Sequence, residues 1–313
     1  MSEAPVPDTG PRGPVGFVGL GNMGIPMARR LAEAGYDVRG FDVSSAARLR
    51  ATDAGVPVVS ALGESVTPAL VILMLPSSAI VEQVLDHPEF RASIQPGTLV
   101  VDMGSSQPSS TRAASEQLGA RSVRLLDAPV SGGVGGAEAG RLTIMVGGSV
   151  DDVAEARPML ECMGRVIHAG PIGAGDAVKA LNNLLSATHL WVTSEAMLVG
   201  QRFGIDPQVL LDVVNSSSGR SGSTENKWPN FILPGSFDSG FALQLMLKDM
   251  RIATQLARDC ELPSRLGEFA VDLWAEASSN LDPAADHTEV ARYLQQQAER
   301  ATSEEPVGTG EER

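Results

Sequence analysis

The chain has 313 residues, and 24 Lys and Arg against 38 Asp and Glu give it a formal net charge of −14 at pH 7. This charge repels the phosphates of nucleic acids and of anionic lipids, so we expect neither nucleic acid nor membrane as a partner. With 43% hydrophobic and 20% charged residues, the composition is that of a globular protein that buries one or two cores.

Cysteine usage and the absence of long apolar runs predict a cytoplasmic protein. Cys162 and Cys260 are too few for a disulfide framework, and no paired Cys or His spacing is typical of a metal site. The longest apolar run, residues 69–75, is far shorter than the roughly 20 residues that span a bilayer. The N-terminus lacks the basic and then apolar pattern of a signal peptide.

Short strand-like and helix-like patterns alternate through the first half of the chain. Residues 1–13 are rich in Pro and Gly and are expected to form a flexible tail, as are residues 298–313. The predicted strands are VGFVGL, YDVRGF, ALVILML, GTLVVDM, SVRLLD and LTIMVGG. Their alternation with helices predicts a doubly wound, mostly parallel α/β sheet of Rossmann type over residues 14–173.

The pattern changes near Gly173. Residues 173–204 contain no proline and carry apolar side chains three and four positions apart, which predicts one helix of about 30 residues, roughly 45 Å long. The remaining patterns are also helical, namely DPQVLLDVVNSSS, FALQLMLKDMRIATQLARDC, PSRLGEFAVDLWAEASS and DHTEVARYLQQQAER. We therefore predict that residues 174–297 consist of this long helix and an all-helical domain.

A glycine-rich loop at the first strand-to-helix junction predicts a dinucleotide site. The loop is Gly19, Leu20, Gly21, Asn22, Met23 and Gly24. Its glycines permit a tight turn, close approach of the backbone to a pyrophosphate, and helix packing on the strand. Asp42 follows the second predicted strand, where a carboxylate binds ribose hydroxyls and repels a 2′-phosphate, so NAD is favoured. Arg39 and Arg48 leave NADP as an alternative.

Three polar residues are predicted to share one face near the start of the long helix. In GAGDAVKALNN, Lys179, Asn182 and Asn183 are separated by three and four positions. Burial would lower the pKa of the lysine and make it a proton donor and acceptor. A solvated lysine beside surface amides fits the same spacing equally well. None of the four histidines lies in a catalytic motif.

Four separated motifs resemble the β-hydroxyacid dehydrogenase family, which includes 3-hydroxyisobutyrate dehydrogenase. They are GFVGLGNMGIPMARRLAEAG at 16–35, DAPVSGGVGGAEAGRLTIMVGG at 127–148, GAGDAVKALNN at 173–183 and LKDMRIA at 247–253. The resemblance covers about residues 14–297. It implies reversible, metal-free, NAD-dependent oxidation of a small β-hydroxyacid to its semialdehyde or oxo acid. It also implies a homodimer or homotetramer that assembles through the helical domain.

The resemblance further implies a role for individual residues. Lys179 would move the hydroxyl proton, Asn183 would orient the substrate, and Asn182 would belong to the same network. The substrate carboxylate would bind at Ser131, Gly132 and Gly133. The cofactor would contact Leu75, Pro76, Ser105 and, from the second domain, Lys248, which Asp249 would position.

Two segments depart from the family pattern. Residues 102–108 lack the common D-x-S-T sequence, so Ser105 alone would supply a hydroxyl to the cofactor. In the polar stretch 215–227, Arg220 and Lys227 would either contact a second polar group of the substrate or be solvated, whereas Trp228 and Phe231 are expected in a core or interface.

Three other functions are compatible with parts of this pattern. Imine reductases resemble the chain in architecture but replace the lysine that Lys179 matches. A non-catalytic dinucleotide-binding scaffold would resemble relatives that have lost this lysine and gained a reader domain. A 6-phosphogluconate dehydrogenase would require a larger helical domain and additional phosphate-binding residues. The dehydrogenase interpretation is therefore favoured, with the scaffold and the imine reductase as alternatives.

Overall fold

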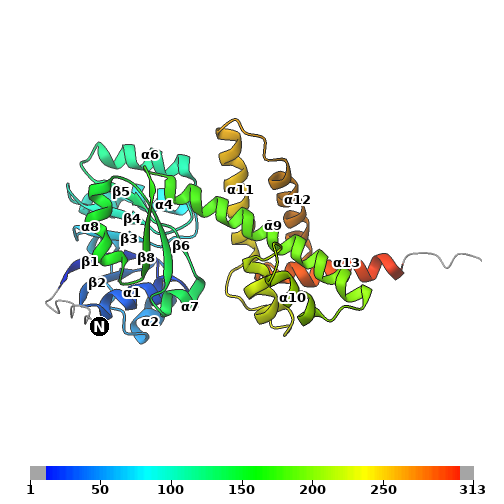
Figure 1. Ribbon diagram of the computed structural model, residues 1–313. Coiled ribbons are helices and arrows are strands. Elements are labelled where there is room, and N and C mark those ends of the chain that lie inside the picture. The colour runs from blue at the N-terminus through cyan, green and yellow to red at the C-terminus, as the bar shows by residue number, and fades with distance from the viewer. Residues whose placement is uncertain (1–11, 304–313) are drawn as a thin grey trace, which may run out of the picture. The chain divides into compact units, whose positions relative to one another are not determined.

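The computed structural model describes residues 12–303 and divides into two compact units (Figure 1). The division falls between Lys179 and Ala180, inside the long helix α9 (Ala174–Phe203). The predicted domain boundary at residue 173 lies at the start of this helix. No helix among residues 12–303 combines the length and apolarity needed to cross a membrane.

The first unit is built on one eight-stranded sheet, in the order β2-β1-β3-β4-β5-β7-β6, with β8 paired to β7. Strands β1 to β5 pair in parallel, β7 runs antiparallel to both β5 and β6, and β8 is parallel to β7. The strands are β1 (Arg12–Val18), β2 (Tyr36–Phe41), β3 (Leu70–Leu73), β4 (Leu99–Asp102), β5 (Arg124–Asp127), β6 (Val130–Ser131), β7 (Leu142–Gly147) and β8 (Gly164–Gly170). The predicted Rossmann-type fold is confirmed, and the mixed edge formed by β6, β7 and β8 is a feature that the prediction lacked.

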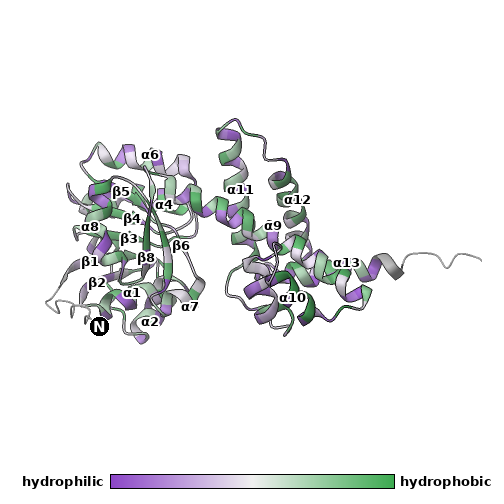
Figure 2. Ribbon diagram, viewed as in Figure 1, coloured by the Kyte–Doolittle hydropathy of each residue, from purple (hydrophilic) through white to green (hydrophobic). Residues whose placement is uncertain are grey.

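The central strands separate two apolar cores, one on each face of the sheet. Side chains alternate along β4, so that Leu99 and Val101 enter one core and Val100 enters the other. Hydrophobic residues accordingly fill these strands (Figure 2). The first core is covered by α1 (Gly24–Glu33), α2 (Ser45–Asp53), α7 (Gly133–Glu138) and α8 (Val150–Leu160). The second is covered by α3 (Leu62–Ser65), α4 (Ser78–Asp86), α5 (Pro88–Ser93) and α6 (Pro108–Gly119).

All the regular elements among the described residues of the second unit are helices, as predicted. It contains α10 (Pro207–Asn215), η1 (Ser223–Ile232), α11 (Leu243–Asp259), α12 (Arg265–Asn280), η2 (His287–Glu289) and α13 (Val290–Ser303). Its core centres on Trp191 and Trp274, whose ring centroids are 6.3 Å apart, and includes Trp228. The segment η1 is a π-helix, for which the sequence shows no distinct pattern.

The two predicted tails lie partly outside the described residues. Residues 1–11 and 304–313 are not described. Strand β1 begins at Arg12, and α13 continues to Ser303. The predicted tails at 1–13 and 298–313 are thus corrected at residues 12–13 and 298–303, which belong to a strand and a helix. The sequence VARYLQQQAERATS has no helix-breaking residue before Ser303, which explains the longer helix.

Candidate active site

The glycine loop joins β1 to α1 and shows three different requirements for glycine. Gly19 has a φ of +102°, and a Cβ there would lie 2.2 Å from the carbonyl oxygen of Met74. A Cβ on Gly24 would lie 1.9 Å from the carbonyl oxygen of Gly19. A Cβ on Gly21 would meet nothing within 4 Å. The fold itself therefore requires Gly19 and Gly24, whereas the space beside Gly21 is open for a ligand to approach the backbone.

Asp42, which follows β2, is hydrogen-bonded to this loop. Its carboxylate accepts hydrogen bonds from the backbone N–H of Leu20, at 2.8 Å, and of Ser44, also at 2.8 Å. Arg48 donates to the carbonyl oxygens of Asp42 and Val43. Both the open space at Gly21 and the position of Asp42 fit the pyrophosphate and ribose of a dinucleotide.

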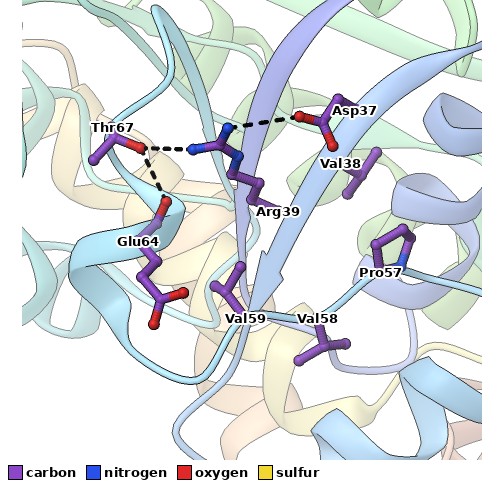
Figure 3. Close-up of a pocket in the computed structure, with 8 residues that line it drawn as sticks. All are labelled: Asp37, Val38, Arg39, Pro57, Val58, Val59, Glu64 and Thr67. Carbon is purple, nitrogen blue, oxygen red and sulfur yellow. Dashed lines mark hydrogen bonds and ion pairs between the residues drawn. The ribbon is translucent and has the colours of Figure 1, made fainter.

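Arg39, the other predicted NADP candidate, faces a separate hollow of about 520 Å³ (Figure 3). Its guanidinium donates to the Thr67 hydroxyl at 3.0 Å and lies 3.6 Å from the Asp37 carboxylate. Apart from Arg39, none of the residues predicted to bind cofactor or substrate lines this hollow. Arg48, and not Arg39, is therefore the arginine that lies beside Asp42.

The predicted contacts at Leu75, Pro76 and Ser105 follow strands β3 and β4. Gly104 packs against the Leu75 backbone, because a Cβ on Gly104 would lie 2.5 Å from the Leu75 carbonyl oxygen. Since β1 to β4 are parallel, these residues, the glycine loop and Asp42 all follow strand ends at the same edge of the sheet. The carboxyl edge of a doubly wound sheet is where dinucleotides bind.

Ser131, Gly132 and Gly133 lie beyond the parallel strands. Ser131 ends β6, which pairs antiparallel with β7, and α7 begins at Gly133. Gly132 and Gly133 have φ values of +136° and +63°. The segment is therefore a turn whose backbone conformation favours glycine, as the S-G-G pattern led us to expect.

Two buried carboxylates that were not among the predicted site residues fix the start of α9. Asp127, at the end of β5, accepts hydrogen bonds from the backbone N–H of Gly173 at 2.7 Å and of Asp176 at 2.9 Å. Asp176 in turn accepts from the Ser106 N–H at 3.1 Å and the Thr111 hydroxyl at 2.7 Å. The first turn of α9 is thereby tied to strand β5 and to the loop that carries Ser105.

The sequence does carry a signal for each of these acids, Asp127 and Asp176. Asp127 opens the DAPVSGG motif, and Asp176 lies in the first turn of a helix, where the helix dipole favours a negative charge. Burial raises the pKa of Asp176 well above its ordinary range, and the nearby charges of Asp102 and Asp127 raise it further. Burial likewise raises the pKa of Asp127, against the opposing effect of the N–H groups that it accepts.

Asp176 is therefore expected to make folding stability decrease with rising pH. A carboxyl whose pKa is raised on folding contributes stability that is fully present below its unfolded pKa of about 4 and is lost as the pH rises through the folded value. Asp176→Asn removes this titration, so the melting temperature of the variant should rise relative to the native protein between about pH 5 and 8. The exposed Asp272→Asn serves as the control. A difference in melting temperature for Asp176→Asn that is constant with pH would contradict the expectation.

The lysine and the amides of α9 differ in exposure. Lys179 and Asn183, four residues apart, are buried, with 8% and 5% of their surfaces exposed. Asn182 is exposed and donates to the Asn183 side-chain oxygen at 3.2 Å. The helix therefore places Lys179 and Asn183 one turn apart on a buried face, while Asn182 supports Asn183 from outside it.

Asn183 begins a polar network within the second unit. Its amide donates to the Asp249 carboxylate at 2.6 Å, and Asp249 is 1% exposed. The other oxygen of Asp249 lies 3.1 Å from the ammonium of Lys248. The two predicted residues Asn183 and Lys248 are thus joined through Asp249, which holds the Asn183 amide in one orientation.

The two cations of the polar stretch after α10, Arg220 and Lys227, differ in exposure. Arg220 is exposed, and its guanidinium lies 3.6 Å from the carboxylate of Glu225, which is also exposed. Lys227 is only partly exposed, with its ammonium 5.5 Å from the centre of the Phe231 ring. Trp228 is buried in the core of the second unit, as expected. Among residues 12–303, no three His, Cys, Asp or Glu side chains are grouped to hold a metal ion.

These features define a class of protein, the dinucleotide-dependent oxidoreductases with a Rossmann-type unit and a helical unit. Residues 14–173 match the family model for the NAD binding domain of 6-phosphogluconate dehydrogenase. Residues 173–294 match the model for the NAD-binding domain of NADP-dependent 3-hydroxyisobutyrate dehydrogenase. The chain belongs to the β-hydroxyacid dehydrogenase family, and NAD is its cofactor, with NADP possible.

Relatives cover nearly the whole chain. It is 40% identical to an NAD-dependent L-serine dehydrogenase of Pseudomonas aeruginosa, over 83% of this chain and 90% of that protein. It is 36% identical to a 2-(hydroxymethyl)glutarate dehydrogenase of Eubacterium barkeri, over 83% and 87%. Among solved structures, the Mycobacterium tuberculosis 3-hydroxyisobutyrate dehydrogenase with L-serine gives a TM-score of 0.84 at 33% identity, covering 90% of this chain and 99% of that one.

Proposed function

We propose that this protein is an NAD-dependent dehydrogenase that reversibly oxidises a small β-hydroxyacid of the 3-hydroxyisobutyrate type to its semialdehyde or oxo acid. The observation that carries the proposal is the buried pair Lys179 and Asn183, one turn apart on a helix whose start is hydrogen-bonded to the dinucleotide-binding unit. The relatives named for L-serine, 2-(hydroxymethyl)glutarate and 3-hydroxyisobutyrate support this substrate class, since the substrate in each name carries a β-hydroxyl group.

Each site residue has a proposed task. Bound NAD supplies the hydride acceptor. Lys179 removes the hydroxyl proton during oxidation and returns it during reduction. Asn183, held by Asp249, orients the substrate hydroxyl, and Asn182 supports it. The substrate carboxylate binds at Ser131, Gly132 and Gly133. The cofactor binds at Gly19 to Gly24, Asp42, Leu75, Pro76, Ser105 and Lys248.

An absorbance assay for NADH tests the proposal directly. Purified protein is mixed at mildly alkaline pH with NAD or NADP and with 3-hydroxyisobutyrate, L-serine or glycerate. We expect NADH formation with at least one acid, and less NADPH formation, because the Asp42 carboxylate repels a 2′-phosphate. Cofactor binding without turnover of any β-hydroxyacid would instead favour the non-catalytic scaffold.

The protein is further proposed to be a homodimer or homotetramer. Apolar side chains at Leu181, Leu185, Val192, Val199 and Phe203 are between 45% and 83% exposed. Their spacing of four and seven residues places them along one side of α9, where a second copy of the chain would bury them. Sedimentation of the purified protein as a monomer at micromolar concentration would contradict this proposal.

A cytoplasmic location is proposed from the cysteines. Neither Cys162 nor Cys260 forms a disulfide within residues 12–303, which suits a reducing compartment. Cell fractionation would test this location, and recovery of the protein outside the cytoplasmic fraction would contradict it.

A further inference from the structure

Lysine is rare in this chain, and its three positions are informative. Of the 24 basic residues, 21 are arginine, and the lysines are Lys179, Lys227 and Lys248. Two of these three are site residues of the proposed dehydrogenase. A compact ammonium on a flexible stem is not interchangeable with a planar guanidinium. Because arginine occupies 21 of the 24 basic positions, the choice of lysine at residue 227 is notable.

The ammonium of Lys227 has no hydrogen-bond or ion-pair partner among residues 12–303. Its side chain is partly buried and lies against the Phe231 ring. Burial lowers its pKa, and the charge of Asp286 acts in the opposite direction. Asp286 forms no hydrogen bond with the Lys227 ammonium. Its carboxylate oxygens instead accept hydrogen bonds from the Ser239 hydroxyl, the backbone N–H groups of Gly240, Phe241 and Thr288, and the Thr288 hydroxyl. Lys227 thus keeps three free N–H donors in a partly desolvated position.

The surrounding backbone holds Lys227 in place. It lies on η1, a ten-residue π-helix whose next residue, Trp228, is anchored in the core of the second unit. Extended π-helical turns are rare and are frequent at functional sites. The backbone at Lys227 is therefore anchored to the core of the second unit.

Lys227 and Lys248 belong to the same part of the second unit. Asp286, whose charge acts on Lys227, pairs through its backbone with Ala242, the residue that precedes α11. Lys248 and Asp249 lie five and six residues after the first residue of α11, or about 8 Å along the helix axis. The Lys248–Asp249 pair, which holds Asn183, thus lies within two helical turns of the residue that pairs with Asp286.

We propose that Lys227 is a specificity-determining residue that binds a second carboxylate on the substrate, so that the preferred β-hydroxyacid is a dicarboxylate. This inference rests on the proposed dehydrogenase function and specifies its substrate class. A monocarboxylate such as 3-hydroxyisobutyrate leaves the Lys227 ammonium without an anion. A second carboxylate accepts its hydrogen bonds and raises its pKa again.

A matched pair of substrates tests the proposal. 2-(Hydroxymethyl)succinate differs from 3-hydroxyisobutyrate only by a carboxymethyl group in place of methyl. We expect native kcat/KM to favour the dicarboxylate, and Lys227→Met to reduce the ratio of the two kcat/KM values by about 10–100-fold, mainly through the KM of the dicarboxylate. Lys227→Arg should retain part of the preference. The control Arg220→Met removes one exposed positive charge from the same stretch and should leave the ratio unchanged.

A binding measurement separates this inference from the proposed activity. Calorimetry with NADH present compares methylsuccinate and isobutyrate, which lack the hydroxyl group and cannot react. Tighter binding of methylsuccinate that is lost in Lys227→Met supports the second carboxylate site even if no acid is oxidised. Two results would overturn the inference while the dehydrogenase function stands. One is turnover of 3-hydroxyisobutyrate by a protein that prefers neither 2-(hydroxymethyl)succinate nor methylsuccinate. The other is a loss of preference in Arg220→Met equal to that in Lys227→Met.

Discussion

Replacing Lys179 by Met is expected to reduce kcat for β-hydroxyacid oxidation by about 10²–10⁴-fold, the range typical of a lost general acid or base. Methionine has a similar length and is apolar, so it should fill the buried position without disturbing α9. Affinity for NADH, measured by fluorescence titration, should change little, because the proposed cofactor groups lie elsewhere in the chain. The two measurements together separate lost chemistry from lost binding.

A second substitution distinguishes proton transfer from simple charge. Lys179→Arg retains a positive charge, but a guanidinium does not release its proton in a protein. We therefore expect Lys179→Arg to be nearly as inactive as Lys179→Met. Substantial turnover by Lys179→Arg would mean that the residue acts through its charge, and near-native turnover by Lys179→Met would exclude it from the chemistry.

Substituting Ala for Gly24 or Gly21 is expected to have different consequences. In Gly24→Ala, the new methyl carbon would lie 1.9 Å from the Gly19 carbonyl oxygen, a severe steric clash, so the glycine loop or α1 has to move. The free energy of unfolding should fall by about 2–3 kcal/mol, as for other overpacked sites, and NADH binding should weaken strongly. Gly21→Ala meets no neighbour, so the stability of the free protein should be close to native while NADH binding weakens.

Denaturant unfolding and NADH titration of both variants check this contrast. Equal stability losses in the two variants would contradict the assignment of a packing role to Gly24 and of cofactor approach without a packing role to Gly21. Native NADH affinity in Gly21→Ala would show that the open space beside Gly21 is not where the cofactor meets the backbone.

The regular elements could be predicted because their signals are local. The second strand, YDVRGF, and the long helix were both predicted closely, since each depends on an unbroken pattern of neighbouring residues. The mixed edge of the sheet was missed for a physical reason. Strand β6 has only two residues. In the β8 sequence GRVIHAG only Gly164 and Val166 are buried, so neither strand forms a strong apolar run.

The candidate site likewise contains residues that local patterns predict and residues that only the folded structure brings into place. The glycine loop and Asp42 could be found because the motif has a fixed spacing and a known position between strand and helix. Asp127 binds backbone groups 46 and 49 residues away, a contact that no local pattern indicates. The environment of Lys227 depends likewise on a π-helix and on Asp286, which is far away in the sequence.

The measurement that tests the central claim most directly is the rate of a single turnover. Native protein and Lys179→Met are each saturated with NAD and mixed rapidly with the best β-hydroxyacid, and NADH absorbance is followed through the first turnover. We predict rapid NADH formation by the native protein and formation slowed by about 10²–10⁴-fold in the variant. Equal first-turnover rates, or no NADH from the native protein with any β-hydroxyacid, would contradict the assignment of this chain as a lysine-dependent dehydrogenase.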